Sequence, residues 1–236
     1  MLAELRTRLS ETWTRRQLSQ TARDVRDAHL TYLTPTKLRN LEDALERIGT
    51  DCIEGDCVEY GVALGGSAIL IATRMTPDRC FTGFDLFGTI PPPGEADGEK
   101  SHERYKIIAS GHSKGIGGDR YYGYEPDLYG KVKAQFARFG VPVDGQRIAL
   151  VKGLFDATVS FKLEKRIAFA HIDCDWHDAV ALCLERTWPH LSRGGIVILD
   201  DYNDYGGCRK ATTAFLERRP DMRLVEATHN AILVKS

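Results

Sequence analysis

Two acidic segments, each following an apolar run, hold the residue types best suited to chemistry. They are His171-Ile172-Asp173-Cys174-Asp175 and Ile198-Leu199-Asp200-Asp201-Tyr202. If the two apolar runs are neighbouring parallel strands, their carboxyl ends lie about 5 Å apart, at the sheet edge where ligands bind. Carboxylates gathered there would repel each other, and a hard divalent cation such as Mg²⁺ would relieve that repulsion. The predicted metal ligands are therefore Asp173, Asp200 and Asp201.

Helix capping is the alternative interpretation of these acids, because aspartate is a favoured residue at helix N-termini. Asp175 and Asp178 fit that role for a helix that begins near His177. Capping does not readily account for three aspartates at the ends of two strands. We therefore expect metal binding from the three and capping from Asp175 and Asp178.

A glycine-rich segment, Glu59-Tyr60-Gly61-Val62-Ala63-Leu64-Gly65-Gly66-Ser67, is the second candidate site. Glycines let the backbone turn tightly and approach a ligand closely. The spacing differs from G-x-G-x-x-G, the fingerprint expected for a nicotinamide dinucleotide, and it suits a cofactor without phosphate, such as S-adenosylmethionine. An acid at Glu59 could meet the ammonium group of that cofactor. The cofactor-binding candidates in this segment are Glu59, Gly61, Gly65 and Ser67.

Asp85 ends the next apolar run along the chain. A carboxylate at that position is well placed to accept both hydroxyls of a ribose, as an acid after the second strand does in dinucleotide folds. A glycine turn is often only a tight connection, and an aspartate at a strand end is often only a cap. The two features occur in order on consecutive strands, which favours cofactor binding.

The elements that must position these residues alternate from Cys52 onward between short apolar runs and helical stretches. Apolar residues recur at helical spacing between the last two runs, so this unit is typical of a βαβ arrangement with parallel strands. A helix is expected at Ser67–Met75. The expected parallel strands are Cys57–Gly61, Cys80–Asp85, Ile148–Lys152, Ile167–Asp173 and Gly195–Asp200.

The two ends of the chain differ from this pattern. Residues 1–50 form an expected N-terminal helical segment, with a helix starting at Thr34-Pro35, and residues 51–236 form the main domain. Met222–Thr228 and Ala231–Lys235 are expected to form a hairpin, which would add an antiparallel strand. Residues 87–129 hold many Gly, Pro and Tyr residues without strong periodicity, and we expect an ordered lid there.

Composition excludes several classes of protein. The 236 residues suit one α/β domain, and the formal net charge of −1 gives no electrostatic reason for a nucleic-acid or anionic-membrane partner. No apolar run approaches the roughly 20 residues of a membrane span, and the first 20 residues lack a signal peptide's apolar stretch, so a cytoplasmic location is expected. The six cysteines contain no C-x-x-C pair. Four of them lie within or beside apolar segments and are expected to be small buried residues, namely Cys57, Cys80, Cys174 and Cys183. A homo-oligomer is left open.

Four segments together resemble the macrocin O-methyltransferase family, a metal-dependent branch of the class I methyltransferases. They are Glu59-x-Gly61-x-x-x-Gly65-Gly66, Asp85-Leu86-Phe87 with Pro91, residues 152–158 (Lys-Gly-Leu-Phe-Asp-Ala-Thr), and the two aspartate segments. The resemblance implies a Rossmann-like α/β fold with a seven-stranded, mostly parallel sheet whose last strand is antiparallel. It also implies S-adenosylmethionine, usually Mg²⁺, and a small-molecule acceptor that carries a sugar hydroxyl. Phe155 and Asp156, in the third segment, join the cofactor-binding candidates.

The expected reaction is methyl transfer to a hydroxyl of a sugar or a glycosylated natural product. A sugar hydroxyl is a poor nucleophile, and metal coordination lowers its pKa and orients it. The candidate bases are Asp173, His112 and His177, although each histidine is more simply a surface or packing residue. A phenol or catechol is the alternative acceptor. A nicotinamide-dependent oxidoreductase and a non-catalytic binding module are further alternatives, disfavoured by the missing dinucleotide fingerprint and by the intact aspartate set.

Overall fold

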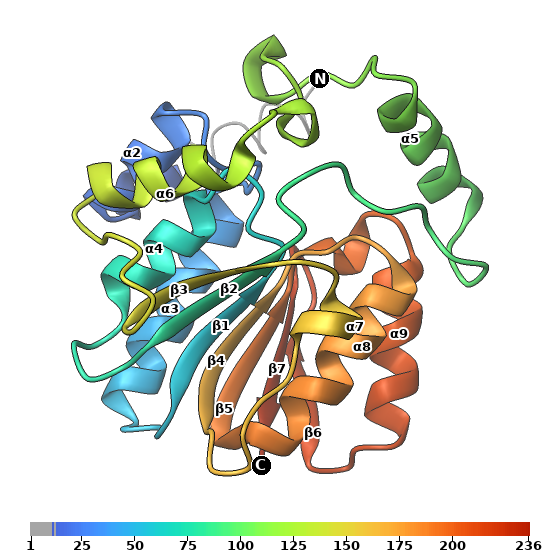
Figure 1. Ribbon diagram of the computed structural model, residues 1–236. Coiled ribbons are helices and arrows are strands. Elements are labelled where there is room, and N and C mark those ends of the chain that lie inside the picture. The colour runs from blue at the N-terminus through green and yellow to red at the C-terminus, as the bar shows by residue number, and fades with distance from the viewer. Residues whose placement is uncertain (1–10, 12) are drawn as a thin grey trace.

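The computed structural model describes residues 11 and 13–236 of the chain (Figure 1). Its centre is a seven-stranded sheet with strand order β3-β2-β1-β4-β5-β7-β6. The expected strands are confirmed, with small differences at their ends. Their bounds are β1 (Asp56–Tyr60), β2 (Phe81–Asp85), β3 (Ile148–Lys152), β4 (Ile167–Ile172), β5 (Leu191–Leu199), β6 (Met222–Glu226) and β7 (Ala231–Lys235).

Strand directions also agree with the sequence. Strands β1 to β5 pair in parallel, whereas β7 runs antiparallel to both β5 and β6. Along the ladders, Tyr60 lies opposite Ile172, and Ile172 lies opposite Leu199. Asp173 and Asp200 are the next residues of their strands, so this register makes the two aspartates leave the sheet side by side.

One face of the sheet is covered by α2 (Gln20–Asp27), α3 (Pro35–Thr50), α4 (Gly66–Arg74) and α6 (Leu128–Arg138), as Figure 1 shows. Their apolar side chains pack with Cys57 and Phe81 of the sheet in one core. The start of α3 is as expected, because the Thr34 side chain accepts a hydrogen bond from the backbone N–H of Lys37 and proline occupies the first turn. Part of the expected N-terminal helical segment, residues 1–10 and 12, lies outside the described residues.

The opposite face is covered by α7 (Phe155–Thr158), α8 (His177–Thr187) and α9 (Gly207–Glu217). Val58 and Tyr60 belong to this second core, while Cys57, which directly precedes Val58, belongs to the first, as the alternation along a strand requires. All six cysteines lie in the described part of the chain and are free. Within that part, no helix is both long and apolar enough to cross a membrane.

The insertion, residues 87–129, runs above the carboxyl ends of the strands (Figure 1). It contains α5 (Glu99–Ala109) and two short 3₁₀ turns, η1 (Ile116–Gly118) and η2 (Tyr122–Tyr124). The helix α5 is a difference from expectation, because the sequence showed no strong periodicity there. Only Ser101 and Ile108 of α5 are buried, so the helix lacks the apolar stripe that would reveal it in the sequence.

Candidate functional site

A cavity of about 330 Å³ lies at the carboxyl edge of the sheet. One wall comes from the strand ends and the loop after β3, and the other comes from the insertion and the start of α8. The volume is within the range of sites that hold small molecules, and the carboxyl edge is where ligands bind in open α/β sheets. Five predicted site residues line it, namely Gly61, Asp85, Phe155, Asp156 and Asp173.

The glycine turn owes part of its composition to packing. Gly61 has φ +92°, and a Cβ atom there would lie 1.8 Å from the backbone oxygen of Asp173. No other residue fits so close an approach of two backbones. Gly61 is therefore required where the end of β1 passes Asp173, in addition to lining the cavity.

Two members of the glycine-rich segment lie away from the cavity wall. Gly65 precedes α4 with φ +91°, and Ser67 is buried inside that helix's first turn. Neither lines the cavity. Their assignment to the cofactor remains a prediction, and their clearest structural role is to start α4.

Glu59 is fully buried and forms a pair with His171 on the neighbouring strand, with 2.7 Å between Oε1 and Nδ1. Glu59 does not line the cavity either. The carboxylate that we expected to meet an ammonium group is thus occupied by an imidazole in this structure. Its Oε2 is buried and has no hydrogen-bond partner.

Asp85 lies at the end of β2 and faces the cavity. Its Oδ2 accepts hydrogen bonds from the backbone N–H groups of Val62 (2.7 Å) and Ala63 (2.9 Å), and its Oδ1 accepts one from Phe87. Burial raises the pKa of Asp85, and these backbone hydrogen bonds oppose that rise. A carboxylate can accept about four hydrogen bonds, so Asp85 keeps capacity for a ligand hydroxyl while it fixes the turn after β1.

The three predicted metal ligands come together beside the cavity, which Asp173 lines and Asp200 and Asp201 do not. Asp173, Asp200 and Asp201 each offer an oxygen atom within 4.8 Å of the others. Burial, and then the charges of Asp200 and Asp201, raise the pKa of Asp173 well above its ordinary value. Burial and the neighbouring charges of Asp175 and Asp200 do the same to Asp201. The cluster is therefore unfavourable as bare carboxylates.

The donor set fits a hard divalent cation. The ligands are oxygen atoms, which Mg²⁺ and similar ions prefer. In addition, Oδ1 of Asp200 is buried and has no hydrogen-bond partner. A buried oxygen of that kind is costly unless something binds it.

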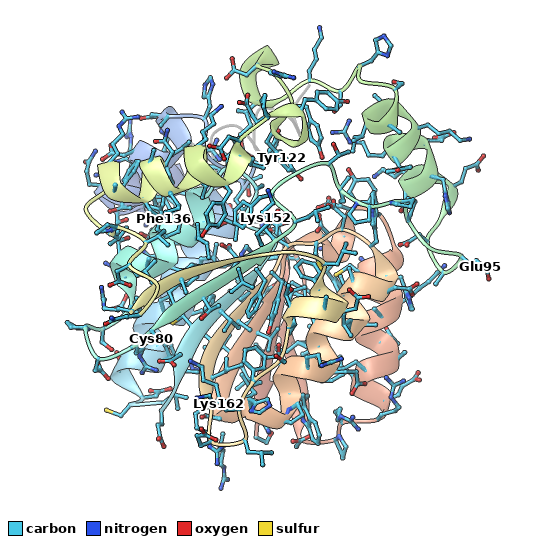
Figure 2. All side chains as sticks on the ribbon, viewed as in Figure 1. Cys80, Glu95, Tyr122, Phe136, Lys152 and Lys162 are labelled. Carbon is cyan, nitrogen blue, oxygen red and sulfur yellow. The ribbon has the colours of Figure 1, made fainter. Side chains whose placement is uncertain are left out.

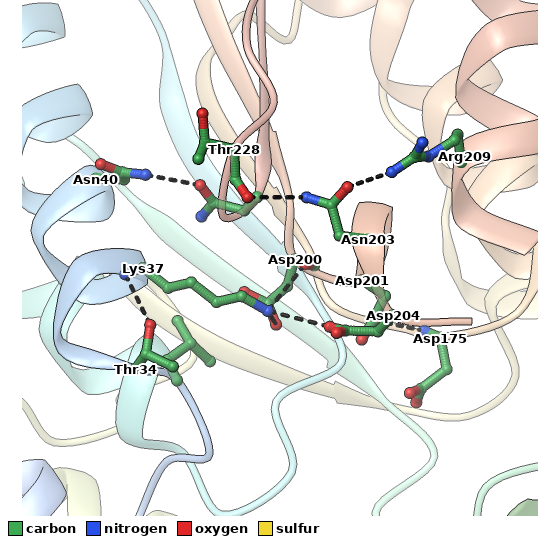
Figure 3. A network of polar contacts seen from close by, with 12 residues as sticks. Thr34, Lys37, Asn40, Asp175, Asp200, Asp201, Asn203, Asp204, Arg209 and Thr228 are labelled. Carbon is green, nitrogen blue, oxygen red and sulfur yellow. Dashed lines mark hydrogen bonds and ion pairs between the residues drawn. The ribbon is translucent and has the colours of Figure 1, made fainter. Parts of the chain in front are cut away.

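A lysine that we did not predict also contacts the cluster (Figure 3). Lys37, in the first turn of α3, donates from Nζ to Oδ2 of Asp200 at 2.9 Å and to Oδ2 of Asp204 at 3.2 Å. Burial alone would lower the pKa of Lys37, but the charge and hydrogen bond of Asp200 outweigh burial and raise it. Lys37 is thus a permanent positive charge beside the carboxylates.

The expectation that Asp175 caps α8 is wrong. The backbone N–H of His177, the first residue of α8, donates to Oδ1 of Asp97 at 2.9 Å, and Asp97 belongs to the insertion. Asp175 instead lines the cavity, and its backbone N–H donates to Oδ2 of Asp201 at 3.0 Å. Asp178 lies in the first turn of α8, with Oδ1 2.7 Å from the ring Nδ1 of His177.

Asp175 has an unusual backbone conformation and a side chain whose pKa is raised. Its φ is +59°, a left-handed conformation that is uncommon for aspartate. Burial, and then the charge of Asp200, raise the pKa of Asp175 to about 7. A carboxyl group with a pKa near neutrality is suited to accepting and releasing a proton.

The two candidate histidines do not line the cavity. His112 is exposed on the insertion, with Nδ1 3.0 Å from Oγ of Ser110. His177 is paired with Asp178 as described above. Of the three predicted bases, only Asp173 therefore lies at the cavity.

The insertion supplies the aromatic and apolar part of the wall. Trp176 donates from its indole N–H to the carbonyl oxygen of Pro91 at 2.9 Å and packs edge-on against Tyr205. Tyr122, labelled in Figure 2 above the strand ends, also lines the cavity, and its burial raises its pKa well above the ordinary value. The acidic end and this apolar end together leave room for a ligand that carries both hydroxyl and apolar groups.

Comparison with known proteins decides the family. The model of the Macrocin-O-methyltransferase (TylF) family matches residues 2–227. The chain belongs to the macrocin O-methyltransferase family. The resemblance seen in the four sequence segments is therefore confirmed, and the family is named for an O-methyltransferase.

The names of similar proteins state the position that is methylated, and one of them includes a rhamnosyl group. The chain is 30% identical over 180 residues to the 8-demethyl-8-(2,3-dimethoxy-alpha-L-rhamnosyl)-tetracenomycin-C 4'-O-methyltransferase of Streptomyces olivaceus, covering 74% of this chain and 63% of that one. It is 27% identical to the Mycinamicin III 3''-O-methyltransferase of Micromonospora griseorubida, covering 80% of this chain and 70% of that one. The chain thus spans less than two thirds of the length of the first of these relatives.

A solved structure supports the fold. The O-methyltransferase NovP superposes with a TM-score of 0.73 at 20% sequence identity, covering 88% of this chain and 82% of that one. The class I methyltransferase fold expected from the sequence is confirmed by this match and by the strand order.

Sequence reasoning missed three residues that form or support this site. Asp97 and Lys37 reach it from 80 and 163 residues away along the chain, so no local spacing could reveal them. Asp175 was visible in the sequence, but a nearby helix start made capping the more economical interpretation. Asp175 has a left-handed backbone conformation, and Asp97 accepts the backbone N–H at the start of α8 in its place.

Proposed function

We propose that this chain transfers a methyl group from S-adenosylmethionine to a hydroxyl of a sugar or a glycosylated small molecule, and that it uses a divalent cation to do so. The observation that carries this proposal is the cluster of Asp173, Asp200 and Asp201, whose member Asp173 lines a cavity at the carboxyl edge of the sheet. Family membership and the relatives' names, one of which includes a rhamnosyl group, support the choice of reaction and acceptor.

The cofactor is proposed to bind along the wall formed by Gly61, Asp85 and the segment 153–156. Asp85 retains lone pairs for the ribose hydroxyls, and the backbone at Gly61 presents no side chain to obstruct the ligand. Phe155 offers an apolar surface beside the carboxylate of Asp156. These three features suit a nucleoside linked to a charged amino-acid part.

Asp173, Asp200 and Asp201 would hold the cation. A divalent cation at this position supplies positive charge that lowers the pKa of a nearby acceptor hydroxyl and orients it. Oδ1 of Asp200, which is buried without a partner, supports this assignment.

Methylation replaces a hydroxyl proton, so the chain must also accept one proton. Asp173 and Asp175 are the candidate bases at the cavity, whereas His112 and His177 lie outside it. Asp175 is the better placed of the two carboxylates, because Asp173 would be bound to the cation. Asp175 contacts Asp201 through its backbone N–H, so its side chain is not used in that contact.

A phenol or catechol acceptor is the alternative that the apolar part of the cavity wall also suits. Ile90, Pro91 and Trp176 make part of that wall apolar, as an aryl ring would require. An apolar aglycone attached to a sugar would meet the same wall. A panel of glycosides and catechols, assayed for methylation with the same enzyme preparation, separates the two.

The experiment that tests the proposal is methyl transfer from labelled S-adenosylmethionine in the presence of excess chelator. Activity should fall to background and return on addition of Mg²⁺, while calorimetry should show cofactor binding nearly unchanged, because cation and cofactor use different residues. Full activity in chelator would contradict the use of a cation. Binding of NAD as tight as that of S-adenosylmethionine would contradict the methyltransferase proposal itself.

A further inference from the structure

Lys37 is part of the acidic cluster although it comes from the N-terminal helix α3. Its side chain is 13% exposed, and its Nζ donates to two atoms of Asp200, the carbonyl oxygen at 3.1 Å and Oδ2 at 2.9 Å. A third hydrogen bond, to Oδ2 of Asp204, completes its donor capacity. Figure 3 shows the lysine chain extended from α3 toward this group. The lysine therefore fixes both the backbone and the carboxylate of Asp200.

The contact divides the two carboxylate oxygens of Asp200 into different roles. Oδ2 is occupied by the ammonium group of Lys37, while Oδ1 is buried and has no partner. Asp201 is divided in a similar way, because its Oδ2 accepts the backbone N–H of Asp175. Each of these two proposed ligands therefore presents one oxygen that accepts no hydrogen bond and one that has already used a lone pair.

The number of oxygens that each carboxylate can offer bears on which cation fits. Ca²⁺ takes six to eight oxygen ligands and often binds carboxylates through both oxygens. Mg²⁺ is smaller, requires six ligands in near-octahedral geometry and usually keeps several water molecules. Ligands limited to one oxygen each suit Mg²⁺ better than Ca²⁺.

We propose that Lys37 is a specificity-determining residue of the cation site: by holding Oδ2 of Asp200, it limits that carboxylate to one ligand oxygen and so favours Mg²⁺ over Ca²⁺. This inference rests on the proposed use of a cation. It goes beyond that proposal because it assigns the choice between cations to a residue that is not itself a ligand.

The charge of Lys37 must be separated from its hydrogen bond. An ammonium group beside the site repels every divalent cation, so it weakens the binding of Mg²⁺ and Ca²⁺ by a similar factor. The hydrogen bond to Oδ2 acts differently on the two ions. The ratio of the two dissociation constants therefore reports the hydrogen bond alone.

The test is calorimetric titration of the full chain with Mg²⁺ and, separately, with Ca²⁺, after chelator treatment and without cofactor or acceptor. Lys37→Met removes the charge and the donors but keeps the length of the side chain. Both cations should bind more tightly to this variant, and the ratio of the Ca²⁺ to the Mg²⁺ dissociation constant should fall about fivefold or more, since Asp200 becomes free to bind through both oxygens.

Two controls isolate the contact with Asp200. Lys37→Arg keeps a cationic donor and should preserve the ratio. Asp204→Asn removes the other carboxylate partner of Lys37, leaves Asp200 paired and should also preserve it. Seven residues of α3 are buried, so the fold should survive loss of the ammonium group, which a melting curve checks. Lys37→Gln repeats the test if the methionine variant does not fold.

The outcomes are distinguishable. An unchanged ratio in Lys37→Met, with both affinities shifted equally, would overturn the inference and leave Lys37 as a simple positive charge. A wild-type protein that binds neither cation would overturn the proposed use of a cation and the role of Lys37 together.

Discussion

The acidic edge of the sheet and the insertion border the same cavity, but different forces hold them in place. Asp173 and Asp200 directly follow β4 and β5, whose backbones are paired along the ladder. The insertion is instead tied down by single side-chain contacts, such as Asp97 to the start of α8 and Trp176 to Pro91. The proposed metal ligands thus follow strands of the sheet, whereas the wall proposed to meet the acceptor lies on a segment that is held by few contacts.

The same difference explains why the sequence predicts one region better than the other. Buried strands appear as continuous apolar runs, and parallel neighbours end at one edge, so the positions of Asp173, Asp200 and Asp201 follow from the order of the strands. The positions of residues in the insertion depend on contacts such as Thr89 with the carbonyl of Gly123, which no periodicity encodes. If the chemistry belongs to the edge and the positioning of the wall to the insertion, changes at the edge should reduce turnover more than changes in the insertion.

The largest effect is expected from Asp173→Asn. Turnover should fall about 100-fold or more, because the change removes a charged ligand and a candidate base from the reacting end. Binding of S-adenosylmethionine, measured by calorimetry, should stay within a small factor. Asp24→Asn, the same change at an exposed position on α2, is the matched control and should leave turnover unaltered. A wild-type rate in Asp173→Asn would move the chemistry away from the acidic edge.

Asp85→Ala is expected to have the next largest effect. Loss of the carboxylate removes the proposed ribose acceptor and leaves the backbone N–H groups of Val62 and Ala63 unpaired. Cofactor binding should weaken by about 1–3 kcal/mol, and the protein should also lose stability. Asp85→Asn keeps an acceptor oxygen and should lose less of both. Unchanged cofactor affinity in the alanine variant would show that Asp85 serves only the turn after β1.

The part of the site that sequence could not predict lies in contacts between distant segments. The start of α8 looked as though it would be capped by its neighbours Asp175 and Asp178, since capping groups are commonly local. The structure uses Asp97 instead, which leaves Asp175 available to the cavity. A local rule failed here because a long-range contact satisfied the same backbone group.

Asp175 gives the acidic edge an expected pH dependence. Its pKa in the folded protein is raised to about 7 by burial and by Asp200, whereas an unfolded aspartate has a pKa near 3.9. Folding therefore favours the protonated form. The contribution of Asp175 to stability is full below about pH 4 and is lost as the pH rises through about 7.

The melting temperature measured in chelator should consequently fall between pH 5 and pH 8. The fall should be smaller in Asp175→Asn, which cannot ionise, with a difference of roughly 2–4 °C for each kcal/mol of penalty removed. Addition of Mg²⁺ should stabilise the wild type more at pH 8 than at pH 5. If the melting temperatures of the two proteins fell in parallel as the pH rose, ionisation of Asp175 would not be what destabilises the folded protein.

The smallest effect is expected from Asp97→Ala, which tests the anchoring of the insertion. Asp97 is buried, its Oδ1 accepts the N–H of His177, and its Oδ2 accepts the N–H of Gly94 at 3.0 Å. Loss of such a helix-end contact costs about 1 kcal/mol, or roughly 2–4 °C of melting temperature in a chain of this size. Limited proteolysis between residues 93 and 124 should become faster, and cofactor with acceptor should restore less protection than in the wild type. Cofactor affinity alone should change little, because the cofactor wall lies on the strand side of the cavity.

Glu95→Ala, an exposed change in the same loop (Figure 2), is the control. If both variants were cut at the wild-type rate, the insertion would be held by contacts other than Asp97, and its difference from the sheet-borne edge would be smaller than we infer.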